Sequence, residues 1–254
     1  MSTSVTGEFA GRTAFVTGGA SGIGRAVCRR LAEGGAAVIV ADRDARAAAE
    51  AAAELTAGGA RALAVSCDVT DPDAVAAAVA TGAERFGGLQ LAVNNAGITG
   101  TRGLVGELTA EEWHQVVSVN LDGVFHSMRY EIPALLAAGG GAVVNIASVA
   151  GTVGLASGSA YTAAKHGVVG LTRSAALEYA SRGIRVNAVG PGFVDTPLLA
   201  FADERQRAYL TSLHPAGRLG TAEDVAELTA FLLSDRADFI TGSHQLVDGG
   251  YTAR

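Results

Sequence analysis

The chain has 254 residues, of which 49% are hydrophobic and 17% are charged, a composition that suits a large buried core. Its formal net charge of −6 at pH 7 argues against nucleic acid as a partner, because proteins that bind polyanions neutralise phosphates with clustered Lys and Arg. The first residues lack a basic start followed by an apolar run, and no apolar stretch approaches the roughly 18 residues of a membrane span, so we expect a cytoplasmic protein with no membrane partner.

Short apolar, β-branched runs recur along the chain between segments with helical patterns. Strands that alternate with helices imply right-handed crossovers and a parallel sheet. Most of these runs are apolar throughout, which is typical of strands covered by helices on both faces. We therefore predict an α/β fold with a doubly wound parallel sheet of about seven strands, and no linker divides it, so residues 1–254 should form a single domain. The predicted strands are residues 13–17, 37–41, 62–65, 91–94, 143–147, 184–189 and 244–247.

A glycine-rich segment follows the first predicted strand and leads into a helix that begins near Gly22. Glycines at such a place permit a tight turn and let backbone N–H groups at the start of the helix approach a pyrophosphate, whose charge the helix dipole also favours. The spacing is GxxxGxG rather than the GxGxxG of the dinucleotide fingerprint. The position directly after the first strand nevertheless supports binding of a dinucleotide pyrophosphate. The candidate cofactor residues here are Gly18, Ser21, Gly22, Ile23 and Gly24.

Asp42 ends the second predicted strand, eighteen residues after Gly24. This is close to the roughly 20-residue offset at which an acidic residue meets the adenosine ribose of a dinucleotide. A carboxylate there accepts hydrogen bonds from the ribose hydroxyls and repels a 2′-phosphate, which favours NAD over NADP. The neighbouring Arg43 leaves NADP open, since a guanidinium can bind a 2′-phosphate or stack on adenine. A helix N-cap is the alternative role for Asp42.

The two cysteines are Cys28, in a predicted helix, and Cys67, at the end of a predicted strand. Neither has CxxC spacing or Cys/His neighbours at ligand spacing. Buried thiols are therefore favoured over a disulfide or a metal site, and we expect no metal.

Tyr161 and Lys165 stand four residues apart in a segment that reads as helix, and Ser148 ends an apolar run upstream. Side chains at i and i+4 of a helix share one face. A free phenol has a pKa of about 10, and an adjacent cation favours its ionised form by roughly 1–3 units when the pair is partly shielded from water. The spacing therefore predicts a proton donor and acceptor tuned toward neutral pH. Packing of the aromatic ring against the aliphatic stem is the alternative.

Taken together, these motifs resemble the short-chain dehydrogenase/reductase family, in its compact branch with a single Rossmann domain. The resemblance covers essentially the whole chain and rests on motifs that follow one another in order: Thr17 to Gly24, Asp68-Val69, Asn94-Asn95-Ala96-Gly97, Asn120, Ser148, Tyr161-x-x-x-Lys165 and Pro191-Gly192. It implies an oxidoreductase that exchanges a hydride between a nicotinamide cofactor and a secondary alcohol or ketone.

The resemblance also implies further cofactor contacts. Asp68 would bind the adenine amino group, with Val69 packing nearby, and Val194 and Thr196 would hold the nicotinamide carboxamide and phosphate. Relatives that prefer NADP often have a basic residue where this chain has Ser21, so NAD is the expected cofactor. The residues added by resemblance are Asp68, Val69, Asn95, Ala96, Gly97, Pro191, Gly192, Val194 and Thr196, together with Tyr161 and Lys165.

The catalytic residues implied by the resemblance are Asn120, Ser148, Tyr161 and Lys165. Tyr161 would be the general acid/base, and Lys165 would lower its pKa and hold the nicotinamide ribose. Ser148 would bind the substrate oxygen, and Asn120 would anchor a water that links Lys165 to solvent. Structural alternatives are a strand-end turn residue for Ser148 and a helix-bending or capping group for Asn120.

The segments expected around the substrate are mostly apolar. Residues 148–157 are small and aliphatic, which suggests an uncharged, partly apolar substrate, and residues 191–212 resemble the family's substrate lid. The apolar side chains of the lid serve equally well to pack on the core or on a neighbouring subunit. Gly190 either loosens the lid hinge or permits a tight bend. An anionic substrate would need basic groups at defined positions in the site, and the sequence does not show where Arg102 and His214 lie. The apolar side chains of the lid are Phe193, Leu198, Leu199, Phe201 and Tyr209.

The resemblance implies a homotetramer formed through the helices that contain Asn120 and Tyr161 and through the C-terminal strand. One alternative function is a 3-oxoacyl-thioester reductase of the same family, although this acidic chain shows no basic patch for an acyl carrier. The other is a nucleotide-binding regulator without catalysis, because a fold alone does not establish a reaction.

Overall fold

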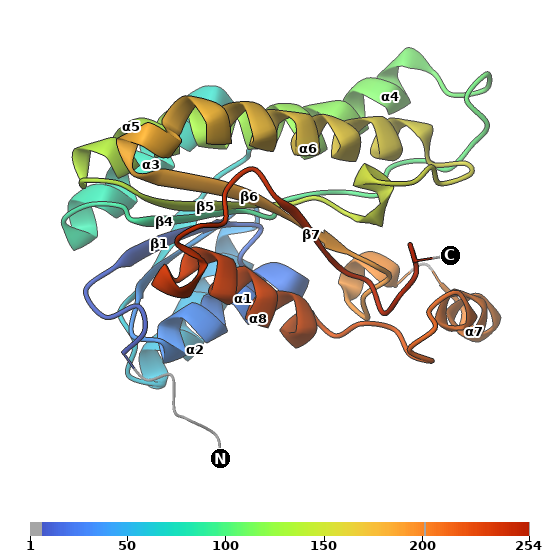
Figure 1. Ribbon diagram of the computed structural model, residues 1–254. Coiled ribbons are helices and arrows are strands. Elements are labelled where there is room, and N and C mark those ends of the chain that lie inside the picture. Colours follow the sequence, from blue (N-terminus) through green and yellow to red (C-terminus); the bar gives the residue numbers. More distant parts are fainter. Residues whose placement is uncertain (1–6, 201, 254) are drawn as a thin grey trace.

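The computed structural model describes residues 7–200 and 202–253 (Figure 1). In these residues seven strands form one sheet in the order β3-β2-β1-β4-β5-β6-β7, and each neighbouring pair is parallel. The predicted doubly wound parallel sheet is therefore confirmed. The strands are β1 (Thr13–Thr17), β2 (Ala37–Asp42), β3 (Ala62–Ser66), β4 (Leu91–Asn94), β5 (Gly141–Ile146), β6 (Ile184–Pro191) and β7 (His244–Val247).

Helices cover both faces of the sheet (Figure 1). One face packs against α1, α2 and α8 and the other against α3, α5 and α6, which explains why every residue of β1 is buried. No helix within residues 7–200 and 202–253 combines the length and hydropathy needed to cross a bilayer. The helices are α1 (Gly22–Glu33), α2 (Ala45–Ala57), α3 (Pro72–Phe86), α4 (Ala110–Val117), α5 (Gly123–Ala137), α6 (Ser159–Tyr179), α7 (Glu204–Ser212) and α8 (Ala222–Leu233).

The carboxyl ends of all these strands lie along one edge of the sheet, because the strands are parallel. The strand order changes direction at β1 and β4: the chain continues from β1 to β2 and β3 on one side, and from β4 to β5, β6 and β7 on the other. Open α/β sheets bind ligands in the crevice outside the carboxyl ends of the strands at such a point. Thr17 and Asn94, which end β1 and β4, therefore flank the place where a site is expected.

Four of the seven predicted strands have boundaries that differ from the structure. The strands β2 and β3 each end one residue later than predicted, at Asp42 and Ser66. The predicted strand 143–147 begins earlier, at Gly141, and ends at Ile146, so that Ala147 and Ser148 leave the sheet. The predicted strand 184–189 continues to Pro191, because Gly190 and Pro191 still pair with β7.

Both cysteines are buried free thiols, as predicted. Burial raises the pKa of Cys67 to about 12 and moves the pKa of Cys28 upward as well, so both stay protonated at neutral pH. In the described part of the chain, no three His, Cys, Asp or Glu side chains are grouped as metal ligands.

A buried polar network connects β4, β5 and α5. The side-chain amide of Asn94 donates to Glu131 Oε2 at 3.0 Å and to Asn145 Oδ1 at 2.9 Å. Burial raises the pKa of Glu131 to about 8, although the hydrogen bond from Asn94 acts in the opposite direction. The Glu131 carboxyl is therefore mostly protonated at neutral pH, which avoids the cost of an unpaired charge in the core.

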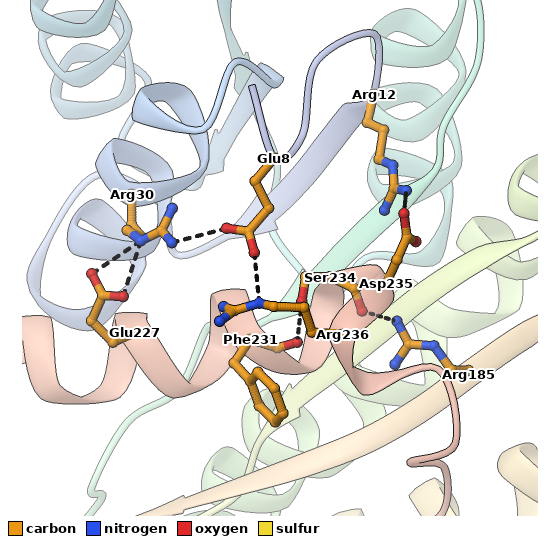
Figure 2. Close-up of polar contacts among 9 residues, drawn as sticks. All are labelled: Glu8, Arg12, Arg30, Arg185, Glu227, Phe231, Ser234, Asp235 and Arg236. Carbon is orange, nitrogen blue, oxygen red and sulfur yellow. Dashed lines mark hydrogen bonds and ion pairs between the residues drawn. The ribbon is translucent and has the colours of Figure 1, made fainter. Parts of the chain in front are cut away.

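An ion-pair network joins the N-terminal segment to α1 and α8 (Figure 2). Arg30 of α1, whose side chain is 9% exposed, lies 3.0 Å from both Glu8 and Glu227. Glu8, 11% exposed, also accepts a hydrogen bond from Arg236 at 3.1 Å. Burial opposes the charge of Arg30, but the hydrogen bonds to the two carboxylates outweigh it and raise the pKa of the guanidinium.

We expect Arg30→Ala to lower the free energy of unfolding by about 3 kcal/mol, because the substitution leaves the buried Glu8 carboxylate without its main partner. Arg46→Ala is the matched control: Arg46 pairs with Glu50 on α2, and their side chains are 82% and 61% exposed. Such a surface pair contributes at most about 1 kcal/mol. Chemical denaturation measures both changes, and equal losses in the two variants would contradict the importance of burial.

Candidate active site

A cavity of about 1060 Å³, open to solvent, lies at the carboxyl ends of β4, β5 and β6. Its position is the crevice expected where the strand order reverses. The predicted residues that line it are Ile23, Asn95, Gly97, Asn120, Ser148, Tyr161, Lys165, Pro191, Gly192, Val194 and Thr196. The structure therefore brings the four candidate catalytic residues to one cavity with part of the candidate cofactor set.

Tyr161 and Ser148 are hydrogen-bonded side chain to side chain on the cavity wall. Tyr161 lies in the first turn of α6, where its ring is half-buried. Ser148 is at the N-cap of a short 3₁₀ helix, Val149–Gly151, and its Oγ accepts a hydrogen bond from Ala150 N at 3.1 Å. The strand end and the helix start thus present two hydroxyl groups side by side, an arrangement that can bind and protonate a substrate oxygen.

The pKa of Tyr161 departs from the sequence-based expectation. An adjacent cation was expected to lower it, whereas in the structure burial raises it above its usual value, and the hydrogen bond to Ser148 opposes this only in part. In the free protein, Tyr161 is therefore a protonated phenol. The protonated phenol can donate a proton. For Tyr161 to accept a proton it must first ionise, and a positive charge nearby would favour that ionised form.

Lys165 lies one turn further along α6, with its Nζ 5.6 Å from the centroid of the Tyr161 ring. Its ammonium group donates to the carbonyl of Ile146 at 2.8 Å. The side chain is 3% exposed, and burial lowers its pKa to about 8. The ammonium is thus desolvated and close to the phenol but directed at the end of β5.

Asn120 lies in a π-helical turn, Ser118–Asp122, between α4 and α5, within the helical run expected from the sequence. Its amide donates to the carbonyls of Val116 at 3.0 Å and Ile98 at 2.9 Å, and its Oδ1 accepts from Ile98 N at 3.3 Å. Asn120 therefore fixes the segment that follows β4. A π turn of this kind frequently marks a functional site.

The glycine turn after β1 has the shape of a phosphate cradle. Gly18 adopts a φ of 61°, and a Cβ added at Gly24 would lie 2.1 Å from the carbonyl oxygen of Gly18, so α1 can approach the turn this closely only with glycine there. In the described chain Ser21, at the N-cap of α1, makes no capping hydrogen bond, and the first turn of α1 has no acidic residue. The N–H groups of this helix start fit a pyrophosphate.

The acidic candidates lie beside this turn. Asp42 accepts hydrogen bonds from Ala20 N at 3.2 Å and from Asp44 N at 3.1 Å, which places its carboxylate against the glycine turn. Asp68 accepts from the backbone and hydroxyl of Thr70 at 2.9 and 2.8 Å, and these bonds lower its pKa. The charge of exposed Arg43 lowers the pKa of Asp68 slightly further.

The segment after β4 connects the glycine turn to the cavity. Asn95 Nδ2 donates to the carbonyls of Thr17 and Gly18 at 3.0 and 3.1 Å, so its amide holds the glycine turn. A Cβ added at Gly97 would lie 2.7 Å from Asn120 Oδ1, which explains glycine at this position. The predicted cofactor residues outside the cavity follow the same edge of the sheet along β1, β2, β3 and β4; they are Gly18, Ser21, Gly22, Gly24, Asp42, Arg43, Asp68, Val69 and Ala96.

Only some of the apolar residues predicted for the lid line the cavity. Phe193, Leu198 and Leu199 line the cavity, whereas Tyr209 is 63% exposed on α7 and lies outside the lining. Phe201 lies outside the described residues. Four lining residues, Thr99, Ile146, Ala147 and Gly158, were not predicted as site residues, and Arg102 was left without an assignment. Their residue types carry no signal, because only the path of the chain in three dimensions brings them to the cavity.

Gly190 has a packing role that the sequence did not reveal. A Cβ there would lie 2.4 Å from His244 Nε2 and 2.8 Å from Leu246 Cδ2, both on β7. Glycine is thus required by the two side chains that pack over β6 rather than by a loose hinge. Burial lowers the pKa of His244, which keeps its imidazole neutral in this position.

Comparison with known proteins agrees with this geometry. A family model described as enoyl-(acyl carrier protein) reductase matches residues 18–252. Cyclohexanol dehydrogenase of Acinetobacter sp. (strain SE19) is 49% identical over 98% of both chains. Cis-4-hydroxycyclohexanecarboxylate dehydrogenase of Sinomonas cyclohexanicum is also 49% identical, over 96% of this chain and 98% of its own. The 3-oxoacyl-[acyl-carrier-protein] reductase FabG of Staphylococcus aureus is 42% identical over 94% of this chain and 97% of its own.

A solved structure shares the fold over nearly the full length. It is a short-chain type dehydrogenase/reductase from Mycobacterium marinum, with a TM-score of 0.93 and 34% sequence identity over 99% of this chain and 98% of its own. Its likeness and the matches in sequence confirm the resemblance seen in the motifs. The chain belongs to the short-chain dehydrogenase/reductase family and is an oxidoreductase that acts on alcohols.

Proposed function

We propose that this protein is an NAD-dependent dehydrogenase that converts a secondary alcohol of a six-membered ring into the ketone, and catalyses the reverse reduction. The observation that carries the proposal is the hydrogen-bonded pair Tyr161 and Ser148 on a largely apolar cavity wall, with Lys165 close to the phenol. The printed activities of the relatives at 49% identity, which concern hydroxyl groups on cyclohexane rings, favour this substrate class.

Tyr161 is the proposed general acid/base. During oxidation, the phenolate oxygen takes the hydroxyl proton of the alcohol while the carbinol hydrogen leaves as a hydride, so that the alcohol becomes a ketone. A bound nicotinamide cofactor supplies the hydride acceptor. Ser148 donates a hydrogen bond to the substrate oxygen. During reduction the protonated phenol, which burial favours in the free protein, gives its proton to the developing alkoxide.

Lys165 and Asn120 have supporting roles in this proposal. Lys165 holds the nicotinamide ribose and stabilises the phenolate of Tyr161 through its charge, an effect that grows when the positive ring of NAD⁺ is present. Asn120 anchors a water between Lys165 and solvent. Its hydrogen bonds to Ile98 and Val116 support a second function, which is to hold the wall of the cavity in place.

NAD is the proposed cofactor in preference to NADP. Asp42 lies against the glycine turn, where a carboxylate would bind the ribose hydroxyls and repel a 2′-phosphate. The remaining cofactor contacts are those expected from the family. In this proposal residues 1–254 form one dinucleotide-binding and catalytic domain, and residues 191–212 form the substrate lid.

We further propose that the protein is a cytoplasmic homotetramer. Exposed apolar side chains occur on the elements expected at the interfaces: Phe125 of α5 is 46% exposed, Leu177 of α6 is 86% exposed and Leu246 of β7 is 38% exposed. Groups of this kind mark association surfaces. Sedimentation velocity should give about four times the chain mass of 25.5 kDa, and a monomer would contradict the proposal.

A 3-oxoacyl-thioester reductase is the alternative within the family, supported by the relative at 42% identity and by the description of the family model. The formal charge of −6 disfavours docking of an acidic carrier protein. Turnover of cyclohexanone compared with that of an acetoacetyl thioester distinguishes the two functions.

Tyr161→Phe should lower kcat for cyclohexanol oxidation by roughly 10²- to 10⁴-fold, since it removes the group that exchanges the proton. NADH binding, measured by fluorescence titration, should persist. Tyr179→Phe is the control, because Tyr179 is the last residue of α6 and lies outside both the cavity lining and the proposed lid. Undiminished turnover in Tyr161→Phe would exclude the mechanism. A wild-type protein that binds NADH but oxidises no alcohol would instead support the alternative of a nucleotide-binding regulator without catalysis.

Asp42→Asn should reduce the preference for NAD⁺ over NADP⁺ roughly tenfold, because it removes the charge that repels the 2′-phosphate. The amide keeps one oxygen as a hydrogen-bond acceptor near Ala20 N. Asp44→Asn removes the same charge two residues away and should leave the preference unchanged. The ratio of kcat/KM values for the two cofactors measures the effect, and a wild-type protein that prefers NADP⁺ would overturn the assignment.

A further inference from the structure

The wall of the active-site cavity carries positive charge. Among the described residues that line it, the cationic side chains are those of Lys165 and Arg102, and no Asp or Glu is present. This differs from the chain as a whole, whose formal net charge is −6. Charges of one sign in a concave site with apolar walls raise the local concentration of the opposite ion.

The two cations have different surroundings. Lys165 is 3% exposed and donates to the carbonyl of Ile146, so in the proposed function its charge serves the phenol and the cofactor. Arg102 is exposed and comes from the loop after β4, which also contributes Thr99 to the cavity. Of the two cations in the lining, it is therefore the one that does not belong to the candidate cofactor residues.

The loop that presents Arg102 is held at both ends. At one end, Asn120 exchanges two hydrogen bonds with the backbone of Ile98. At the other end, Gly103 N donates to the carbonyl of Ser157 at 3.2 Å, and Gly103 forms a β-bridge with Gly158. Arg102 is thus fixed, through its neighbour, to the loop that leads into Tyr161.

The anchor on that second loop is itself unusual. Ser157, with a φ of 60°, is the one non-glycine residue in the described part of the chain with a positive φ. A residue held in the left-handed region has a cost of about 1–3 kcal/mol, and such strain concentrates at ligand sites. Its carbonyl is the acceptor for Gly103, so the strained residue links the loop of Arg102 to the wall of the cavity.

Apart from Lys165 and Arg102, none of the described residues in the cavity lining is charged. Leu155, Phe193 and Leu198 are apolar lining residues. Asp195, which lies between Phe193 and Leu198 in the sequence, is ion-paired with Arg207, and neither it nor Asp203 nor Glu204 lines the cavity. A substrate between these walls therefore meets apolar side chains, the hydroxyls of the candidate catalytic residues and the guanidinium group.

We propose that Arg102 is a specificity-determining residue that binds a carboxylate on the substrate, so that the preferred substrate is a ring alcohol with an anionic substituent away from its hydroxyl group. This inference rests on the proposed function, because the hydroxyl must lie at Tyr161 and Ser148 while the carboxylate reaches Arg102. The planar guanidinium has five N–H donors, and two of them match the oxygens of a carboxylate. Because Arg102 is exposed, salt should weaken the interaction.

The test compares three alcohols with NAD⁺: cis-4-hydroxycyclohexanecarboxylate, its methyl ester and cyclohexanol. The ester retains the shape of the acid without its charge. Wild-type protein should show a kcat/KM for the acid roughly tenfold above that for the ester, and 0.5 M salt should reduce this ratio. Arg102→Gln should abolish the ratio mainly through KM and leave kcat for cyclohexanol within about twofold.

Arg61→Gln is the matched control, because Arg61 precedes β3 and thus lies at the opposite edge of the sheet, where the same change of charge should leave the ratio intact. If the wild type oxidises cyclohexanol but Arg102→Gln leaves the acid-to-ester ratio of kcat/KM unchanged, the role of Arg102 is overturned. The proposed function would stand in that case. Failure of the wild type to oxidise any of the three alcohols would overturn the proposed function and this inference with it.

Discussion

The segment that leaves β4 is held by two amide side chains, and both halves of the site depend on it. Asn95 donates to the carbonyls of Thr17 and Gly18 and thereby fixes the glycine turn against the neighbouring strand. Asn120 reaches the same segment at Ile98 from the π-helical turn. At the carboxyl edge the sheet ladder has ended, so backbone groups there need other partners. Side-chain amides provide them and position the glycine turn and the cavity wall relative to each other.

Burial, more than the proximity of charges, determines the protonation of the candidate catalytic residues Tyr161 and Lys165 in the free protein. It raises the pKa of Tyr161 and lowers that of Lys165 to about 8, so that both ionised forms are disfavoured. The free site is consequently prepared to donate a proton. In the proposed mechanism the oxidation direction needs the phenolate, and this couples the ionisation of Tyr161 to the binding of the positively charged cofactor.

The sequence predicted the parallel sheet and the order of its motifs well, because apolar runs and glycine spacing are local features. The sequence was less informative where packing between distant elements determines the residue type or the local backbone conformation. Gly190 was interpreted as a hinge or a bend, yet the reason for glycine is the pair of β7 side chains, His244 and Leu246, that occupy the space of a Cβ. At Asn120 the sequence predicted a helical run, with a helix-bending role as one alternative for this residue, but it did not predict the π turn itself. Neither feature has a local pattern that would identify it.

The amino-acid sequence alone determined the fold class, the family and the set of candidate catalytic residues, since these depend on the periodicity of side chains and on the order of motifs. Only the tertiary structure decided the charge of the cavity wall. The aliphatic loop 148–157 favoured an uncharged substrate, whereas the pairing of Gly103 with Ser157 brings Arg102 to the same cavity from a different loop. A cavity is formed by segments that are distant along the chain, and its electrostatic character follows from which of them meet.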